Sequence, residues 1–287
     1  MTHRIARAMG ASLLLLTAPS LLLSACDEAH GEHEHLTLTF APHVSGVPFV
    51  CGDTYDNLGA SGDQSLTIKD ARFYAHNFRV VDADGTEFPV ELEQDGTFQH
   101  DGLVYIDFAD SSISGCEGNP QTNVTVVGTV PPGSYVALRF TVGVPFEDNH
   151  ADASVAASPL NVTDMFWAWQ SGYKFMRLDG ASTGLPDWRF HLGSTGCVGD
   201  PTAGGVTSCA APNRVEVEIA SEHFMHEPIG VDFGALLSDV DLDTQTENTP
   251  PGCMSGAMDP DCTPYFEALG LPHGTMAAGT QRVFSLD

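Results

Sequence analysis

The sequence predicts an all-β fold, an antiparallel β-sandwich with long disulfide-stapled loops and a few short helices. Short runs of alternating or β-rich residues recur along the chain, turn signals separate them, and segments with helical periodicity are scarce. This combination is typical of sandwiches and barrels built from many short strands. The expected strands are residues 36–40, 71–81, 87–92, 103–108, 123–130, 135–144, 188–193, 214–220 and 281–286.

Gly, Pro and Asp mark the turns between these strands, as in "DADG" (82–85), "EQDG" (93–96) and "PPGS" (131–134). Such residues favour tight turns because they supply positive φ angles or preset backbone angles. Only "DFGALLSDVD" (232–241) and "PYFEALG" (264–270) favour short helices.

Two segments, 202–208 and 247–262, are expected to be loops, and each contains or adjoins cysteines. No internal repeat and no clear boundary for a second domain is evident. Residues 36–287 are therefore expected to form a single β-sandwich domain.

The N-terminus predicts a lipoprotein signal peptide over residues 1–25. Arg4 and Arg7 precede an apolar stretch, which ends in "LSAC" at Cys26. The small residues before Cys26 indicate that its thiol receives a lipid; the alternative is an ordinary signal peptide with a chance cysteine. We expect an exported, lipid-anchored protein in the periplasm or outer membrane, or at the cell surface, of a Gram-negative bacterium.

Residues 26–35 are polar and are expected to form an acidic, His-rich tether. His30, His33 and His35 alternate with acidic residues there. Such a tract either binds metals loosely or is simply a solvated leash, and the sequence leaves both open.

The formal net charge is −27. An acidic surface repels phosphate backbones, so nucleic acid is not expected as a partner.

Six cysteines remain after Cys26, and an even number in an exported chain indicates disulfides because that compartment is oxidising. Closure of the short loops would pair Cys197 with Cys209 and Cys253 with Cys262. Cys51 and Cys116 would then form the third bond. Thiolate metal ligation is the alternative, but the chain has no C-x-x-C.

We expect no enzyme activity and no catalytic residues. The chain contains no Gly-rich phosphate loop and no H-E-x-x-H. A weak calcium site is suggested by Asp239, Asp241 and Asp243, although Thr244 stands where a tight calcium loop needs glycine.

Three histidines could bind a metal, and imidazole nitrogen suits copper and zinc. His76 lies in an expected strand, His150 ends "PFEDNH", and His191 lies in "WRFHLG". Taken singly, each is more often an ordinary core or surface residue.

An unusual aromatic stretch, "MFWAWQSGYKF", spans residues 165–175 and contains Trp167 and Trp169. In a strand the two indoles would face the same way, because side chains alternate. From residue types alone, they would form a core plug.

Several segments together resemble the MbnP-like W-x-W family of exported copper-binding proteins. They occur in the order "FAPHVSGVPFVCG" (40–52), "ARFYAHNFRVV" (71–81), "VGVPFEDNHADA" (142–153), "SPLNVTDMFWAWQSGYKFMRLDG" (158–180) and "FHLGSTGC" (190–197). The resemblance spans about residues 36–287. Family members are often lipoproteins and are typically paired with a di-haem peroxidase-like enzyme of the MauG type.

The resemblance implies one copper ion and an oxidised tryptophan. The di-haem partner converts Trp167 or Trp169 to kynurenine, and the opened ring takes part in copper binding beside His150 and His191, with His76 as a third candidate. Such oxidation requires an accessible W-x-W, whereas the core interpretation requires a buried one. The alternative function is a β-sandwich adhesion or carbohydrate-binding lipoprotein, with the aromatic stretch as core or as a stacking platform.

Overall fold

The computed structural model describes residues 1, 33–200 and 205–287. The compact unit spans Glu32–Asp287. The expected signal peptide, Cys26 and residues 26–32 of the tether lie outside the described residues, as does His30. Within the described part of the chain, no helix has the length and apolar character needed to cross a membrane.

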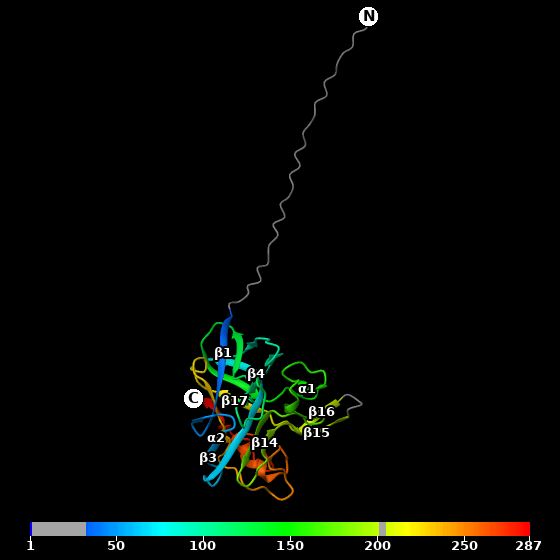
Figure 1. Cartoon of the computed structure of the whole chain (residues 1–287). Helices are drawn as coiled ribbons and strands as arrows, with labels where there is room; N and C mark the ends of the chain where they lie inside the picture. Colours follow the sequence, from blue (N-terminus) through cyan, green and yellow to red (C-terminus); the bar gives the residue numbers. More distant parts are fainter. Residues whose placement is uncertain (2–32, 201–204) are drawn as a thin grey trace. The chain divides into compact units, whose positions relative to one another are not determined.

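The structure confirms the all-β class, with strands distributed over two main sheets (Figure 1). The first sheet has the order β20–β18–β1–β9–β6, with β2 paired to β1. Its strands are β1 (Glu34–Val44), β2 (Val47–Pro48), β6 (Glu91–Leu92), β9 (Thr125–Val130), β18 (Ile229–Asp232) and β20 (Phe284–Leu286). β1 begins at Glu34 and therefore includes the last two residues of the expected tether.

The second sheet is organised around the long strand β4 (Gln64–Asp82), which pairs with five other strands. Its main path is β17–β10–β4–β13–β14–β19. The other strands are β3 (Thr54–Leu58), β5 (Glu87–Pro89), β7 (Gln99–His100), β8 (Leu103–Asp107), β10 (Tyr135–Val142), β13 (Met176–Ser182), β14 (Trp188–Leu192), β17 (Val215–Ile219) and β19 (Gly252–Cys253).

Two small hairpins stand apart from these sheets. They are β11 (Phe166–Ala168) with β12 (Gly172–Tyr173), and β15 (Thr195–Asp200) with β16 (Gly205–Ala211). The helices are all short: α1 (Phe146–Asn149), α2 (Phe233–Leu237), α3 (Thr263–Ala268) and the 3-10 turns η1 (Thr163–Met165) and η2 (Pro260–Cys262). α2 lies within the expected helical segment 232–241, and α3 overlaps the segment 264–270 but begins one residue earlier.

Two sequence-based expectations need correction. The loop expected at 202–208 belongs, from Gly205 onward, to β16, because cross-strand pairing with β15 overrides its weak β propensity. The pairing is also not wholly antiparallel, since β1 pairs with β18 and β14 with β19 in parallel.

Aromatic side chains join the inner faces of the two sheets. The Phe40 ring on β1 makes edge-to-face contacts with Phe73 on β4, at 5.4 Å between centroids, and with Phe140 on β10, at 5.7 Å. Phe284 on β20 contacts the same two rings at 5.6 Å. These rings are almost completely buried, so they form the centre of the sandwich core.

Three disulfides close the loops, and they join the pairs that loop length indicated: Cys51–Cys116, Cys197–Cys209 and Cys253–Cys262. All six cysteines in the described part of the chain are paired, so none of these six offers a thiolate to a metal in this state.

Replacing Phe40 by alanine should destabilise the fold by about 3–5 kcal/mol, because it leaves a cavity where the two sheets meet. Urea unfolding followed by circular dichroism measures this loss. The control is Val155→Ala, at a side chain that is 80% exposed, which should change the unfolding free energy by less than about 0.5 kcal/mol. Equal effects of both substitutions would contradict this account of the core.

Candidate metal centre

The W-x-W stretch forms a small hairpin at the surface instead of a core strand. Trp167 lies in β11 and is half-buried, whereas Trp169 lies in the following turn and is 36% exposed. β11 ends at Ala168, so strand alternation does not place both indoles on one face. The core plug in this part of the fold is a different tryptophan, Trp188, which is fully buried and donates its indole N–H to Tyr265 Oη at 3.2 Å.

The buried residue Asn149 holds this hairpin in place. Its Oδ1 accepts the backbone N–H of Tyr173 at 2.8 Å, and its Nδ2 donates to the Ser171 carbonyl at 3.4 Å. Gly172 has φ +75°, and a Cβ there would lie 2.3 Å from the Asn149 carbonyl oxygen. The glycine in "SGYKF" is therefore required both by backbone angle and by space.

Trp167 packs against the end of β14. Its ring lies 6.0 Å from the His191 imidazole, centroid to centroid, in an edge-to-face arrangement. A Cβ on Gly193 would be 2.7 Å from the Trp167 ring. Gly193 thus makes room for the indole, and this contact places Trp167 beside a histidine that the sequence predicts as a ligand.

His191 is oriented by a buried carboxylate. Its Nε2 lies 2.6 Å from Asp179 Oδ1, on the neighbouring strand β13. A carboxylate accepts, so Nε2 carries the proton and Nδ1 keeps its lone pair. Nδ1 is buried and has no hydrogen-bond partner among the described residues. A histidine that donates one N–H to a carboxylate and presents the other nitrogen is the usual arrangement of a metal ligand.

A chain of buried charges extends behind this pair. Arg177 donates to Asp179 at 2.6 Å and lies 3.2 Å from Asp70, which in turn is paired with Arg72. Burial alone would raise the pKa of Asp179, but the hydrogen bond from His191 and the charge of Arg177 lower it to about 2. Burial lowers the pKa of His191, although the hydrogen bond to Asp179 and its charge act to raise it. The ring is therefore neutral at neutral pH and can donate the Nδ1 electron pair to a metal.

His150 approaches the same hairpin from another side. It caps the end of α1, next to Asn149, and its Nε2 lies 3.1 Å from Asn149 Nδ2 and 3.4 Å from Cys209 Sγ. Burial and then the charge of Arg214 lower its pKa, and its Nδ1 is buried without a partner among the described residues. Gln170, in the W-x-W turn, donates to the Cys197 carbonyl at 2.6 Å. The W-x-W turn is therefore hydrogen-bonded to one cysteine of the disulfide that lies beside His150, whereas Trp167 contacts His191.

His76 fits a ligand role less well than the other two histidines. Its Nε2 is also buried without a partner in the described residues. Burial, followed by the charges of Arg214 and Arg79, lowers its pKa to about 4. Two nearby guanidinium groups make this position unfavourable for a metal cation.

The predicted ligands do not converge into one tight cluster of three. Among the described residues, ligand atoms of three potential metal-binding side chains come within 4.8 Å of one another only at His150, Cys197 and Cys209. Two of these are the sulfur atoms of a disulfide. What the structure does bring together is Trp167 with His191, and His150 with the Cys197–Cys209 bond.

The suggested calcium site does not form in the described structure. Asp239 pairs with Arg282, Asp241 accepts hydrogen bonds from Gln64 and Thr244, and Asp243 accepts from the Gly184 N–H. Each carboxylate thus has a separate partner, and the three do not gather as ligands.

Two histidines of the expected tether, His33 and His35, lie beside Glu91 and Glu93, respectively, at 3.8 and 3.2 Å.

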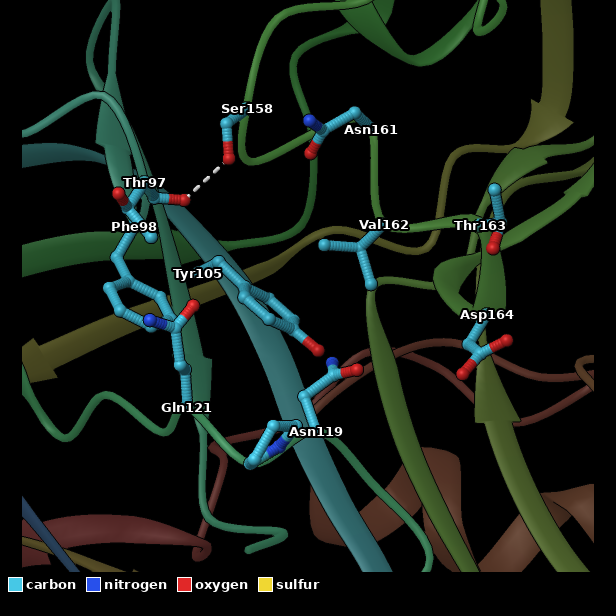
Figure 2. A pocket seen from close by; sticks show the side chains of 11 residues that line it. Thr97, Phe98, Tyr105, Asn119, Gln121, Ser158, Asn161, Val162, Thr163 and Asp164 are labelled. Atoms are coloured by element: carbon cyan, nitrogen blue, oxygen red, sulfur yellow. Dashed lines mark hydrogen bonds between the residues drawn. The ribbon is translucent and has the colours of Figure 1, made fainter. Parts of the chain in front are cut away.

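A cavity lies elsewhere on the protein, and Figure 2 shows its lining. It has a volume of about 370 Å³, and its aromatic residues are Phe98 and Tyr105. Ser158 Oγ donates to the Thr97 carbonyl at 2.7 Å at its edge. Trp167 and Trp169 do not line this cavity.

Sequence reasoning did not single out Asp179, Asn149 or Gly193. All three lie inside segments that carry the family resemblance, but only the folded structure shows what each residue contacts. The acid in "RLDG" is separated from His191 by 12 positions in the sequence and gives no local signal of its hydrogen bond to that histidine.

Replacing Gly193 by alanine should displace the Trp167 indole, since the new methyl group would overlap its ring. In a Trp169→Phe background, we expect a red shift of tryptophan fluorescence and a loss of about 1–3 kcal/mol of stability. Gly279→Ala, where a Cβ meets nothing within 4 Å, is the control. An unchanged spectrum in the Gly193 variant would show that Trp167 does not pack there.

Comparisons with known proteins agree with this geometry. The family model for MbnP matches residues 33–255. Among solved structures, MbnP from Methylosinus trichosporium aligns with a TM-score of 0.78 and 29% sequence identity, covering 89% of this chain and 98% of that one. The search of curated proteins gives no significant match. The chain belongs to the MbnP family.

Proposed function

We propose that this protein is an exported, lipid-anchored copper-binding protein, without catalytic turnover of its own, whose copper site includes a tryptophan oxidised to kynurenine. The observation that carries the proposal is the His191 side chain. Its Nδ1 is buried and unpartnered among the described residues, its Nε2 is fixed by Asp179, and Trp167 lies against the ring.

The donor types in this region fit copper. Burial lowers the pKa of both histidines. His191 offers the lone pair of its unpartnered Nδ1, whereas the lone pair of His150 lies on Nε2, which accepts a hydrogen bond from Asn149 Nδ2. Neutral imidazole suits copper, and Asp179 raises the donor strength of His191. Copper bound there would be the cargo that the protein stores, acquires or delivers. His76 remains a less favourable third candidate.

Oxidation supplies the donor that an intact indole lacks. The indole nitrogen lone pair belongs to the aromatic ring. Ring opening removes four electrons from the indole, adds oxygen and, after hydrolysis, releases the C2 carbon as formate, which leaves an aniline nitrogen and a ketone oxygen. Trp167 is the better candidate for the converted residue, because it already contacts His191. Trp169 is the more exposed of the pair and lies in the adjoining turn, where it would relay electrons from Trp167 to the partner.

The proposed partner is a di-haem enzyme of the MauG type. Its oxidised haems would draw electrons from the W-x-W hairpin at the protein surface, so the target need not enter a haem pocket. The position of this hairpin outside both main sheets supports such docking, because the pair is accessible without unfolding of the core.

The modification is testable by mass spectrometry. Protein produced together with its di-haem partner should carry an increase of about 4 Da, one carbon lost and one oxygen gained, at Trp167. Peptide mapping of residues 158–180 locates it, and protein produced without the partner is the control. Unmodified Trp167 and Trp169 in the presence of active partner would contradict the proposal.

The role of Asp179 is testable by copper affinity. Asp179→Asn should weaken copper binding by about 10–100-fold, because the His191 ring loses its anchor and part of its donor strength. His191→Ala should weaken it at least as much. His226→Ala, at an exposed histidine, is the control and should bind copper as the unchanged protein does. Equal affinities in all three variants would remove His191 from the site.

A further inference from the structure

The Cys197–Cys209 disulfide lies directly beside His150. The two cysteines are cross-strand partners in β15 and β16, and the His150 Nε2 is 3.4 Å from Cys209 Sγ. The imidazole nitrogen and both sulfur atoms lie within 4.8 Å of one another. Neither of the other two disulfides has a third ligand atom at this distance among the described residues.

We propose that reduction of the Cys197–Cys209 disulfide creates a second, sulfur-rich site, in which the two thiolates and His150 Nε2 bind one Cu(I) ion. Disulfide sulfur is a poor ligand, whereas thiolates bind Cu(I) strongly. The reductant is a dithiol. It gives two electrons and two protons to the S–S bond and becomes a disulfide itself, and the two new thiols release their protons when the metal binds.

The position of this disulfide favours its reduction before that of the Cys253–Cys262 bond. It closes the β15–β16 hairpin, which is separate from both main sheets. Cys209 is half-buried, whereas Cys253 and Cys262 are completely buried. Thiol–disulfide exchange requires access of the attacking thiolate, so the hairpin bond should react before the Cys253–Cys262 bond, and the main sheets keep their pairing when it opens.

His150 is a candidate ligand of both proposed sites. Its Nε2 faces the sulfur atoms and accepts a hydrogen bond from Asn149 Nδ2, which a bound metal would displace. The thiolate site contains no tryptophan, so it stands whether or not Trp167 is oxidised. Where both sites form, the redox state of the Cys197–Cys209 bond determines whether His150 binds a metal together with the two thiolates.

The test uses the full chain carrying Trp167→Phe and Trp169→Phe, in which no kynurenine site can form. Dithiothreitol is titrated anaerobically and removed, and alkylation with mass spectrometry identifies the fraction in which Cys197 and Cys209 alone are reduced. Competition with bicinchoninate then measures Cu(I) binding. We expect one additional Cu(I) per chain, bound at least about 100-fold more tightly than by the oxidised protein.

Two variants and one chemical block give the controls. In the same background, Cys51→Ala with Cys116→Ala should keep the gain, whereas His150→Ala should lose about tenfold or more of the affinity. Iodoacetamide treatment of the reduced protein should abolish the gain without any substitution, so a folding defect cannot imitate the result. The proposal is overturned if reduced and oxidised protein bind Cu(I) equally, or if His150→Ala leaves the gain unchanged.

Discussion

The hydrogen bond between Asp179 and His191 is the constraint on which the site depends. It fixes the imidazole so that Nδ1 is the free nitrogen, and it lies at the end of a buried series of charges, Asp70, Arg72 and Arg177. These residues come from three adjacent strands, β4, β13 and β14, whose register places Asp70 opposite Asp179 and Arg177 opposite His191. The central sheet therefore acts as a rigid support for a single donor atom.

The arrangement explains why costly groups are buried at this place. A buried charge is tolerated only when it is paired and hydrogen-bonded, and each member of this series has a partner. Loss of one carboxylate would leave a guanidinium uncompensated. Stabilisation of the fold alone does not explain the free-energy cost of burying these charges, because apolar residues of similar volume often stabilise a core equally well or better. We propose that this buried series serves to position His191.

The fold class, most strands and the disulfide pairs could be predicted from sequence, because side-chain alternation and loop length are local signals. The site could be predicted only in part. His150, His191 and Trp167 lie in recognisable segments, but Asp179, Asn149 and Gly193 act through contacts that only the folded chain creates. Strand alternation also failed at Trp169, because β11 ends at Ala168 and Asn149 holds the chain in a turn.

The central claim is that copper binds between His191 and the opened ring of Trp167. An anomalous difference map, recorded at the copper absorption edge from crystals of protein produced with its di-haem partner, tests it most directly. The account predicts one strong peak at bonding distance from His191 Nδ1 and from a kynurenine at position 167. A peak elsewhere, with an intact indole still packed on His191, would contradict it.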